Sequence, residues 1–299
     1  MRTRSRLGLY GLGVVAVFGI AAAVGAGLGP IDVGASPSHS SMPDTSATVG
    51  GTEMSGLAVA AAGYRLVLGS DVIAAGGQSP LTFRIERDDG SALVRFDDLH
   101  ERKLHLIVLS RNLVDYHHLH PVMDADGLWQ VEAPPLAAGS YRVYADFKPH
   151  GGEQITLASD VSVPGSVARI SIPTVSSKVD VGGYSVSLSG HPVVGESTLT
   201  FEVSRNGTAV VTEPYLGAAG HLVVVRSGDL GYVHVHPVET AQRGPISFTA
   251  PFPTPGTYRL FFDFSHAGSV RTASFTVDVA AVTVASSSST PHGVESPMP

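Results

Sequence analysis

An internal repeat constrains this chain more than any other feature of its sequence. Residues 116–121 read Tyr-His-His-Leu-His-Pro, and residues 232–237 read Tyr-Val-His-Val-His-Pro. A further histidine stands thirteen residues before the first histidine that both segments share, at His105 and at His221. Two copies of one unit therefore make up most of the chain, which at 299 residues is long enough to bury two ordinary cores.

A second pair of matched segments lies further along the chain. Residues 139–147 read Gly-Ser-Tyr-Arg-Val-Tyr-Ala-Asp-Phe, and residues 256–264 read Gly-Thr-Tyr-Arg-Leu-Phe-Phe-Asp-Phe. The Gly-x-Tyr at the start of each resembles the corner tyrosine near a late strand of immunoglobulin-like domains, which indicates an equivalent strand in each repeat.

The apolar pattern predicts strands. Apolar residues recur at every second position in residues 64–68, 81–85, 199–203 and 273–277, and this alternation is typical of half-buried strands. Turn sequences such as Asn206-Gly207 separate these segments. No long stretch with a period of 3.6 residues follows the N-terminal segment. We therefore predict an all-β chain of tandem immunoglobulin-like β-sandwiches, with about seven strands in each.

The N-terminal segment predicts export. Arg2, Arg4 and Arg6 precede an uncharged apolar run over residues 7–29. This run is long enough to span a hydrocarbon core of ~30 Å as an uncleaved transmembrane anchor, and it also has the features of a signal peptide. Both alternatives place the rest of the chain outside the cytoplasm, either anchored to the membrane or secreted.

Composition shifts define the expected domain boundaries. Segments rich in Ser, Pro, Gly and Thr predict a flexible stalk, a linker between the repeats and a disordered tail. The expected organisation is a signal anchor or signal peptide at 1–30, a stalk at 31–56, a first sandwich at 57–164, a linker at 165–180, a second sandwich at 181–280 and a tail at 281–299.

Composition also excludes several kinds of function. The formal net charge is -7, and no cluster of Lys and Arg lies beyond the first six residues, so we expect no nucleic-acid partner. The chain has no cysteine. Disulfides, thiolate catalysis, cysteine zinc sites and blue-copper centres are therefore excluded.

The His-x-His pattern predicts a metal site in each repeat. Alternate side chains of a strand share a face, so His118 and His120 should project together. If Gly228-Asp229 forms a two-residue turn, Val223 lies opposite His234, and the same alignment applies in the first repeat. Directly opposed Cβ atoms lie ~4.5–5.5 Å apart, so three imidazoles could converge on one ion. The predicted ligands are His105, His118 and His120 in one site and His221, His234 and His236 in the other.

Four more residues complete the predicted sites. Asp146 and Asp263 occupy equivalent places on a neighbouring strand, where a carboxylate could accept the second ring N–H of a ligand histidine and fix its orientation. His150 and His266 follow these strands and are candidate fourth ligands.

The leading hypothesis is a non-enzymatic, extracytoplasmic metal-binding protein with one histidine site per repeat. Imidazole suits both Zn(II) and Cu(II), and the sequence does not choose between them. The alternative is a structural or interaction module of two immunoglobulin-like domains that binds no metal. Metal-assisted hydrolysis ranks third, because no general base accompanies the histidines at a fixed spacing.

The repeated segments resemble those of a group of bacterial exported proteins with one or two β-sandwich units. The shared pattern is His-Leu-(Ile/Val)-Val, then His-(Leu/Val)-His-Pro, then Gly-x-Tyr-Arg-(Val/Leu) and Asp-Phe, and here it covers residues 64–279. Such proteins are often labelled as heavy-metal-binding or copper-associated, which the resemblance implies for this chain. A looser similarity is to periplasmic copper carriers, from which this chain departs by having few methionines near its histidines.

Overall fold

The computed structural model describes residues 54–238 and 244–281, and these residues form strands, turns and loops without a helix. No helix in this described part is long and apolar enough to cross a membrane. The fold class predicted from the period-two pattern is confirmed. The apolar run at 7–29, most of the predicted stalk and nearly all of the predicted tail lie outside the described residues.

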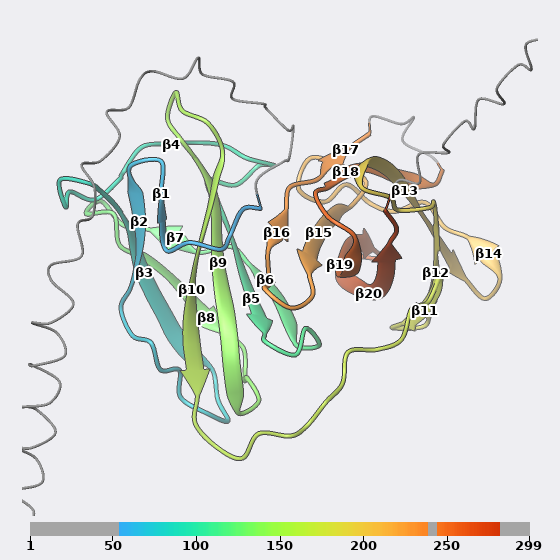
Figure 1. The fold of residues 1–299 in the computed structure, drawn as a ribbon, viewed down its shortest axis with the longest axis horizontal. Coiled ribbons are helices and arrows are strands. Elements are labelled where there is room, and N and C mark those ends of the chain that lie inside the picture. The colour runs from blue at the N-terminus through green and yellow to red at the C-terminus, as the bar shows by residue number, and fades with distance from the viewer. Residues whose placement is uncertain (1–53, 239–243, 282–299) are drawn as a thin grey trace, which may run out of the picture. The chain divides into compact units, whose positions relative to one another are not determined.

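The first sandwich consists of two antiparallel sheets (Figure 1). One sheet has the order β1-β2-β3-β8-β7, and the other has the order β10-β9-β5-β6 with β4 beside β9. The strands are β1 (Ala60–Ala61), β2 (Tyr64–Leu68), β3 (Ser79–Arg87), β4 (Phe96–Asp97), β5 (Leu104–Ser110), β6 (Tyr116–Leu119), β7 (Val122–Met123), β8 (Trp129–Ala133), β9 (Gly139–Pro149) and β10 (Ile155–Val163).

The second sandwich repeats this topology. Its sheets have the orders β11-β12-β13-β18-β17, with β14 beside β13, and β16-β15-β19-β20. The strands are β11 (Lys178–Val181), β12 (Tyr184–Ser189), β13 (Gly195–Arg205), β14 (Thr208–Ala209), β15 (His221–Arg226), β16 (Tyr232–Val233), β17 (His236–Pro237), β18 (Ile246–Phe252), β19 (Gly256–His266) and β20 (Ser269–Val279). Strand β11 begins inside the segment expected to be linker.

Both sandwiches have immunoglobulin-like strand order and a tyrosine corner. The Tyr141 hydroxyl donates to the carbonyl of Ala137 at 3.0 Å, and the Tyr258 hydroxyl donates to the carbonyl of Thr254 at 2.9 Å. The glycine two residues before each tyrosine has a φ of 155° or 140°, which residues with a Cβ rarely adopt. The predicted Gly-x-Tyr corner is therefore present in both repeats.

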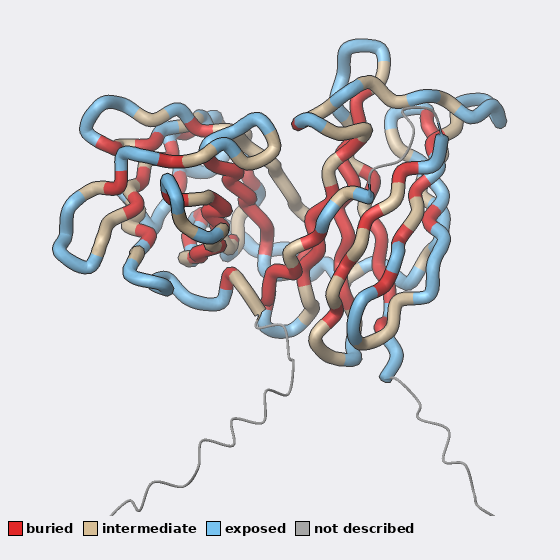
Figure 2. Tube along the Cα trace, turned by 90° about the horizontal axis from the view of Figure 1, so that it is seen from above, coloured by how far each residue is buried: buried red, intermediate tan, exposed pale blue. Residues whose placement is uncertain are grey.

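Alternation along the strands builds a core in each sandwich. In β3, Leu81, Phe83 and Ile85 point inward and are almost fully buried, while the residues between them are more exposed. Figure 2 shows buried positions recurring along the strands in this way. Trp129 stacks on Phe83 within the first core, as expected for a packing residue.

Strands β5 and β15 depart from this alternation because both of their faces are covered. Every residue of β5 is buried, and so are the four central residues of β15. Leu106 and Val108 face the core of the first sandwich, whereas Ile107 and Leu109 belong to a separate cluster. This cluster, here called the shared core, contains side chains of both repeats: Ile107, Leu109, Leu113, Tyr144, Ala158, Val223, Val225, Leu230, Tyr232 and Phe261.

Hydrogen bonds cross the shared core in both directions. The Tyr144 hydroxyl donates to the carbonyl of Leu230 at 2.7 Å, and the buried Arg259 Nε donates to the carbonyl of Leu113 at 3.0 Å. Leu113 and Leu230 have φ values of 61° and 64°, a left-handed conformation that costs about 1–2 kcal/mol for a residue with a Cβ. In each repeat, this left-handed leucine therefore presents its carbonyl group to a donor of the opposite repeat.

Replacing Tyr258 by Phe removes the corner hydrogen bond without removing the ring. We expect the free energy of unfolding to fall by about 1–2 kcal/mol, because the partly buried carbonyl of Thr254 loses its donor. Urea denaturation followed by fluorescence measures this. Tyr64→Phe is the matched control, since its hydroxyl bonds to none of the described residues, and an equal loss in both variants would contradict the assignment.

Candidate metal centre

The two histidine hairpins have the predicted register. In the first repeat Ile107 pairs with His118, and in the second Val224 pairs with Val233, which is the alignment that places Val223 opposite His234. The connecting loop runs over residues 227–230 rather than being a two-residue turn, because Arg226 already bonds to the carbonyl of Gly231. The longer loop adds one residue to each side, so the register does not change.

The His-x-His segments mark the point where the chain changes sheets. Strand β6 ends at Leu119, and after Pro121 the chain joins the other sheet as β7, paired with β8. In the second repeat His236 already belongs to that other sheet, where it pairs with Thr249. The two histidines of each pair still lie together, with ring centroids 4.7 Å apart for His118 and His120, and 4.8 Å apart for His234 and His236.

His105 on β5 and His221 on β15 each point toward the other repeat. His105 lies on the same face of β5 as Ile107, and His221 lies on the same face of β15 as Val223. Because Ile107 and Val223 meet in the shared core, the two histidines at the ends of these faces also meet. Their rings stack with centroids 5.4 Å apart and an angle of 13° between the planes.

The result is a group of three histidines drawn from both repeats. His105, His118 and His221 each bring one ring nitrogen within 4.8 Å of the others, so this group could hold a metal ion. We call it the histidine centre. Its composition differs from the predicted grouping, in which each repeat supplied three ligands of its own.

Hydrogen bonds fix the orientation of His105 and His118. His105 Nε2 lies 2.7 Å from the carbonyl oxygen of Leu99, and His105 Nδ1 lies 2.9 Å from His118 Nε2. His118 Nδ1 in turn lies 2.9 Å from Asp263 Oδ2 of the second repeat. Asp263 thus orients His118 of the other repeat. Within its own sheet, Asp263 pairs with His221 across β15 and β19.

Asp263 is a buried carboxyl group with several donors. Thr272 Oγ1 donates to its Oδ1 at 2.5 Å, and the Tyr116 hydroxyl donates to its Oδ2 at 3.3 Å. Burial raises the pKa of Asp263 to about 7, although these hydrogen bonds act to lower it. The group is therefore poised to gain or lose a proton close to neutral pH.

Burial keeps the neighbouring histidines neutral. It lowers the pKa of each ring by penalising the charged form, and the nearby histidines add to this effect at several of them. The pKa falls to about 4 for His105, His120 and His234, and well below the usual 6.5 for His118 and His221. Neutral imidazole is the form that binds metal ions.

The other predicted ligands lie beside the centre or away from it. The ring centroid of His120 is 5.3 Å from that of His105, while His234 bonds to Gln154 rather than to another histidine. His150 is exposed and pairs with Asp97 at 2.7 Å. His266 accepts a hydrogen bond from Tyr184 or donates one to it, at 2.7 Å. Among the described residues, the centre therefore includes neither candidate fourth ligand.

Sequence analysis missed one histidine. The ring of His100 lies 5.7 Å from that of His221 and 6.1 Å from that of His105. His100 has a φ of 47°, and the second repeat has the same left-handed conformation at Leu216. Because the counterpart is a leucine, comparing the repeats could not find His100. Its only signal was its position five residues before His105.

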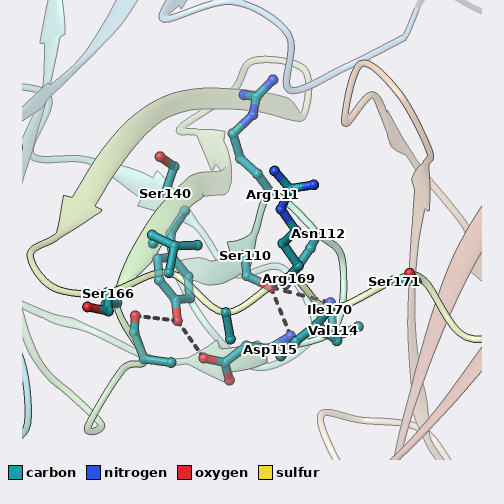
Figure 3. A pocket seen from close by; sticks show the side chains of 16 residues that line it. Ser110, Arg111, Asn112, Val114, Asp115, Ser140, Ser166, Arg169, Ile170 and Ser171 are labelled. Atoms are coloured by element: carbon teal, nitrogen blue, oxygen red, sulfur yellow. Dashed lines mark hydrogen bonds between the residues drawn. The ribbon is translucent and has the colours of Figure 1, made fainter.

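A further cavity lies elsewhere. It measures about 580 Å³ and is bounded by Ser110–Asp115, the corner at Ala137–Tyr141 and the connecting segment at Ser166–Ser171. Asp115, labelled in Figure 3, lines this cavity and accepts a hydrogen bond from the Tyr141 hydroxyl at 2.7 Å. None of the predicted metal ligands lines this cavity, so it does not belong to the histidine centre.

The buried histidines make stability depend on pH. In the unfolded chain a histidine has a pKa of ~6.5, so below this value the unfolded state binds more protons than the folded state, and stability falls toward pH 4. Asp263 and Asp146 oppose this, because burial raises their pKa and their folded forms take up protons first. Six histidines with a lowered pKa outnumber the two carboxyl groups with a raised pKa, so unfolding near pH 5 takes up protons on balance.

We therefore expect the metal-free protein to lose stability steeply between pH 6.5 and 4, at about 1.4 kcal/mol per pH unit for each net proton. Urea denaturation at pH 7, 6 and 5 in the presence of a chelator measures this. A free energy of unfolding that stays constant or rises as the pH falls from 7 to 5 would show that the histidines are not buried as described.

The comparisons with known proteins identify a repeated domain. A protein-family model described as "Domain of unknown function (DUF8832)" matches residues 58–165 and again residues 177–281. The expected tandem repeat is thereby confirmed. No curated protein matches the chain.

Several solved structures are similar in part. A DUF4426 family protein from Pseudomonas aeruginosa is 10% identical, with 34% of this chain and 96% of that chain covered and a TM-score of 0.27. InvD of Yersinia pseudotuberculosis is 13% identical (77% and 61% covered, TM-score 0.24), and the Ig1-2 module of the Drosophila receptor protein tyrosine phosphatase DLAR is 8% identical (74% and 99% covered, TM-score 0.20). Similarity at this level carries no information about function.

Proposed function

Because this chain belongs to the family of that domain of unknown function, in two copies, we propose its function from the geometry of its own residues. The chain binds one divalent transition-metal ion, Zn(II) or Cu(II), through His105, His118 and His221. The site lies between the repeats and takes ligands from both, instead of one site lying in each repeat.

The hydrogen-bond partners of His105 and His118 are the observation that supports this proposal. The carbonyl of Leu99 can only accept, so His105 Nε2 carries the proton and His105 Nδ1 presents a lone pair. When Asp263 is ionised it accepts from His118 Nδ1, and His118 Nε2 then presents a lone pair too. Two lone pairs face each other across 2.9 Å, which is repulsive unless a cation lies between them.

A proton can fill the same place when no metal is bound. Protonated Asp263 donates to His118 Nδ1, and His118 Nε2–H then donates to His105 Nδ1, which satisfies every group in the chain of hydrogen bonds. In this form, with Asp263 protonated, the metal-free protein holds one proton that metal binding must expel.

The third ligand also fits. His221 Nδ1 is shielded from solvent and has no hydrogen-bond partner among the described residues, which is costly for a buried polar atom. Nitrogens bound tetrahedrally at ~2.0–2.1 Å from a metal lie about 3.3–3.4 Å apart. The ring nitrogens, now within 4.8 Å of one another, need to move by about 1.5 Å or less to reach this arrangement.

The donor set favours borderline ions. Three neutral imidazoles without a thiolate, thioether or carboxylate ligand suit Zn(II) and Cu(II), and intrinsic affinity favours Cu(II). Three protein ligands leave a further coordination position open. Arg2, Arg4, Arg6 and the apolar run at 7–29 support a location outside the cytoplasm, where both ions are available to an exported protein.

The proposal predicts one bound ion per chain that depends on residues of both repeats. After dialysis against Zn(II) or, separately, Cu(II), elemental analysis should give one equivalent at this site for the wild-type protein. His118→Ala and His221→Ala should each lose it, because each removes one of three ligands. His150→Ala should retain it, because His150 pairs with Asp97 away from the centre.

Three outcomes of that analysis would contradict the proposal. If the wild-type protein bound two equivalents of metal, and substituting the His-x-His pair of either repeat removed one of them, each repeat would hold a site of its own. Retention of the ion by His221→Ala together with its loss in His120→Ala would place the site within the first repeat. No bound metal in the wild-type protein would leave a module of two immunoglobulin-like domains whose histidines only pack.

Metal binding should also release a proton in a pH-dependent way. With a pKa of about 7, Asp263 is mostly protonated at pH 6 and mostly ionised at pH 8. We expect release of roughly one proton per ion at pH 6, decreasing toward zero at pH 8, because the histidines are already neutral. Calorimetry in buffers of different ionisation enthalpy measures this number. In Asp263→Asn the dependence should disappear, and its persistence there would exclude Asp263 as the source.

A further inference from the structure

The two repeats contain equivalent buried carboxylates. Thr156 pairs with Asp146 across β9 and β10, and Thr272 pairs with Asp263 across β19 and β20. In both pairs the threonine hydroxyl donates to Oδ1 of the aspartate, at 2.9 Å and 2.5 Å. Asp146 and Asp263 therefore occupy the same position in the fold.

Their contacts with the histidine of the opposite repeat differ. Asp263 Oδ2 lies 2.9 Å from His118 Nδ1 with nothing between them. On the other side a glutamine intervenes: Gln154 Nε2 lies 3.1 Å and 2.9 Å from the two carboxylate oxygens of Asp146, and 3.1 Å from His234 Nδ1. Gln154 therefore bridges Asp146 and His234.

This difference determines which ring nitrogen holds the proton. The carboxylate oxygens require the amide nitrogen of Gln154, rather than its oxygen, to face Asp146, and this same nitrogen then donates to His234 Nδ1. His234 consequently carries its proton on Nε2. When Asp263 is ionised, His118 donates to it from Nδ1 and leaves Nε2 free, so the two matched histidines then have opposite tautomers.

The counterpart of Gln154 in the second repeat is Val270. Each lies two positions before the threonine that bonds to the aspartate, at Thr156 and Thr272. Val270 is 48% exposed and lines a cavity of about 320 Å³ together with His118 and Asp263. A valine has no donor to insert between them, although the cavity has room for a longer side chain.

We propose that Gln154 is a positioning residue that excludes His234 from the metal centre, and that the valine at position 270 allows His118 to be a ligand. The part of this inference that concerns metal rests on the proposed function. The part that concerns the tautomer of His234 does not, since it follows from the hydrogen bonds of Gln154.

Two reciprocal variants test the inference in the full chain. Gln154→Val copies the second repeat into the first, and Val270→Gln does the reverse, with Val270→Ala as a control at the same exposed position. Two-bond ¹H–¹⁵N correlation spectra of the metal-free proteins at pH 8 report which nitrogen of each histidine is protonated. Zn(II) titration reports affinity.

In the wild-type protein we expect the proton on Nε2 of His234 and on Nδ1 of His118. In Gln154→Val the proton of His234 should move to Nδ1, toward Asp146, with Zn(II) affinity unchanged. In Val270→Gln the proton of His118 should move to Nε2, and affinity should fall by about 10–100-fold although every ligand remains. Val270→Ala should match the wild-type protein in both measurements.

The inference is overturned if His234 carries its proton on Nδ1 in the wild-type protein, or if Gln154→Val leaves its tautomer unchanged. If Val270→Gln moved the His118 proton to Nε2 but left Zn(II) affinity unchanged, the proposal that Val270 allows His118 to bind the ion would also be overturned. If the wild-type protein bound no Zn(II), the proposed function would fail, while the spectra would still decide the role of Gln154.

Discussion

The packing of one sheet of each repeat against the other is the constraint on which the histidine centre depends. Ile107, Val223 and Phe261 are fully buried in the shared core, and burying an aliphatic or aromatic side chain of this size contributes ~1.5–3 kcal/mol. Without this apolar contact His105 and His221 would lie at the surfaces of separate domains. The histidine centre therefore follows from hydrophobic packing, which brings its three histidines together without an ion.

The same packing has an electrostatic cost. His105 and His118 are withdrawn from water beside the buried carboxyl group of Asp263, and charged forms of such groups are strongly penalised there. Hydrogen bonds from Thr272 and Tyr116 to Asp263, and from His105 to Leu99, offset part of this penalty. A buried polar network of this kind is stable only when each member has a partner. Here one position has to be filled by a proton or an ion.

Much of the fold could be predicted from the sequence, because it depends on local pattern. Alternation gave strands such as β3, the Gly-x-Tyr segments gave the corners at Tyr141 and Tyr258, and the hairpin alignment placed Ile107 opposite His118. The grouping of the histidines depends on contacts between repeats, which no local pattern encodes. One signal was present: residues 106–109 and 222–225, which follow His105 and His221, are unbroken apolar runs typical of strands covered on both faces. The bridging role of Gln154 left no trace, because position 270 is a valine.

The difference between Gln154 and Val270 has a consequence for how such a centre could arise. A homodimer of a single repeat would place the same residue at this position in both subunits, so both histidine pairs would be blocked or both would be free. Two copies within one chain can diverge, so that one half keeps a geometry suited to a ligand while the other loses it. Gene duplication in this chain thus made possible an asymmetric site that no twofold-symmetric assembly of the same domain can form.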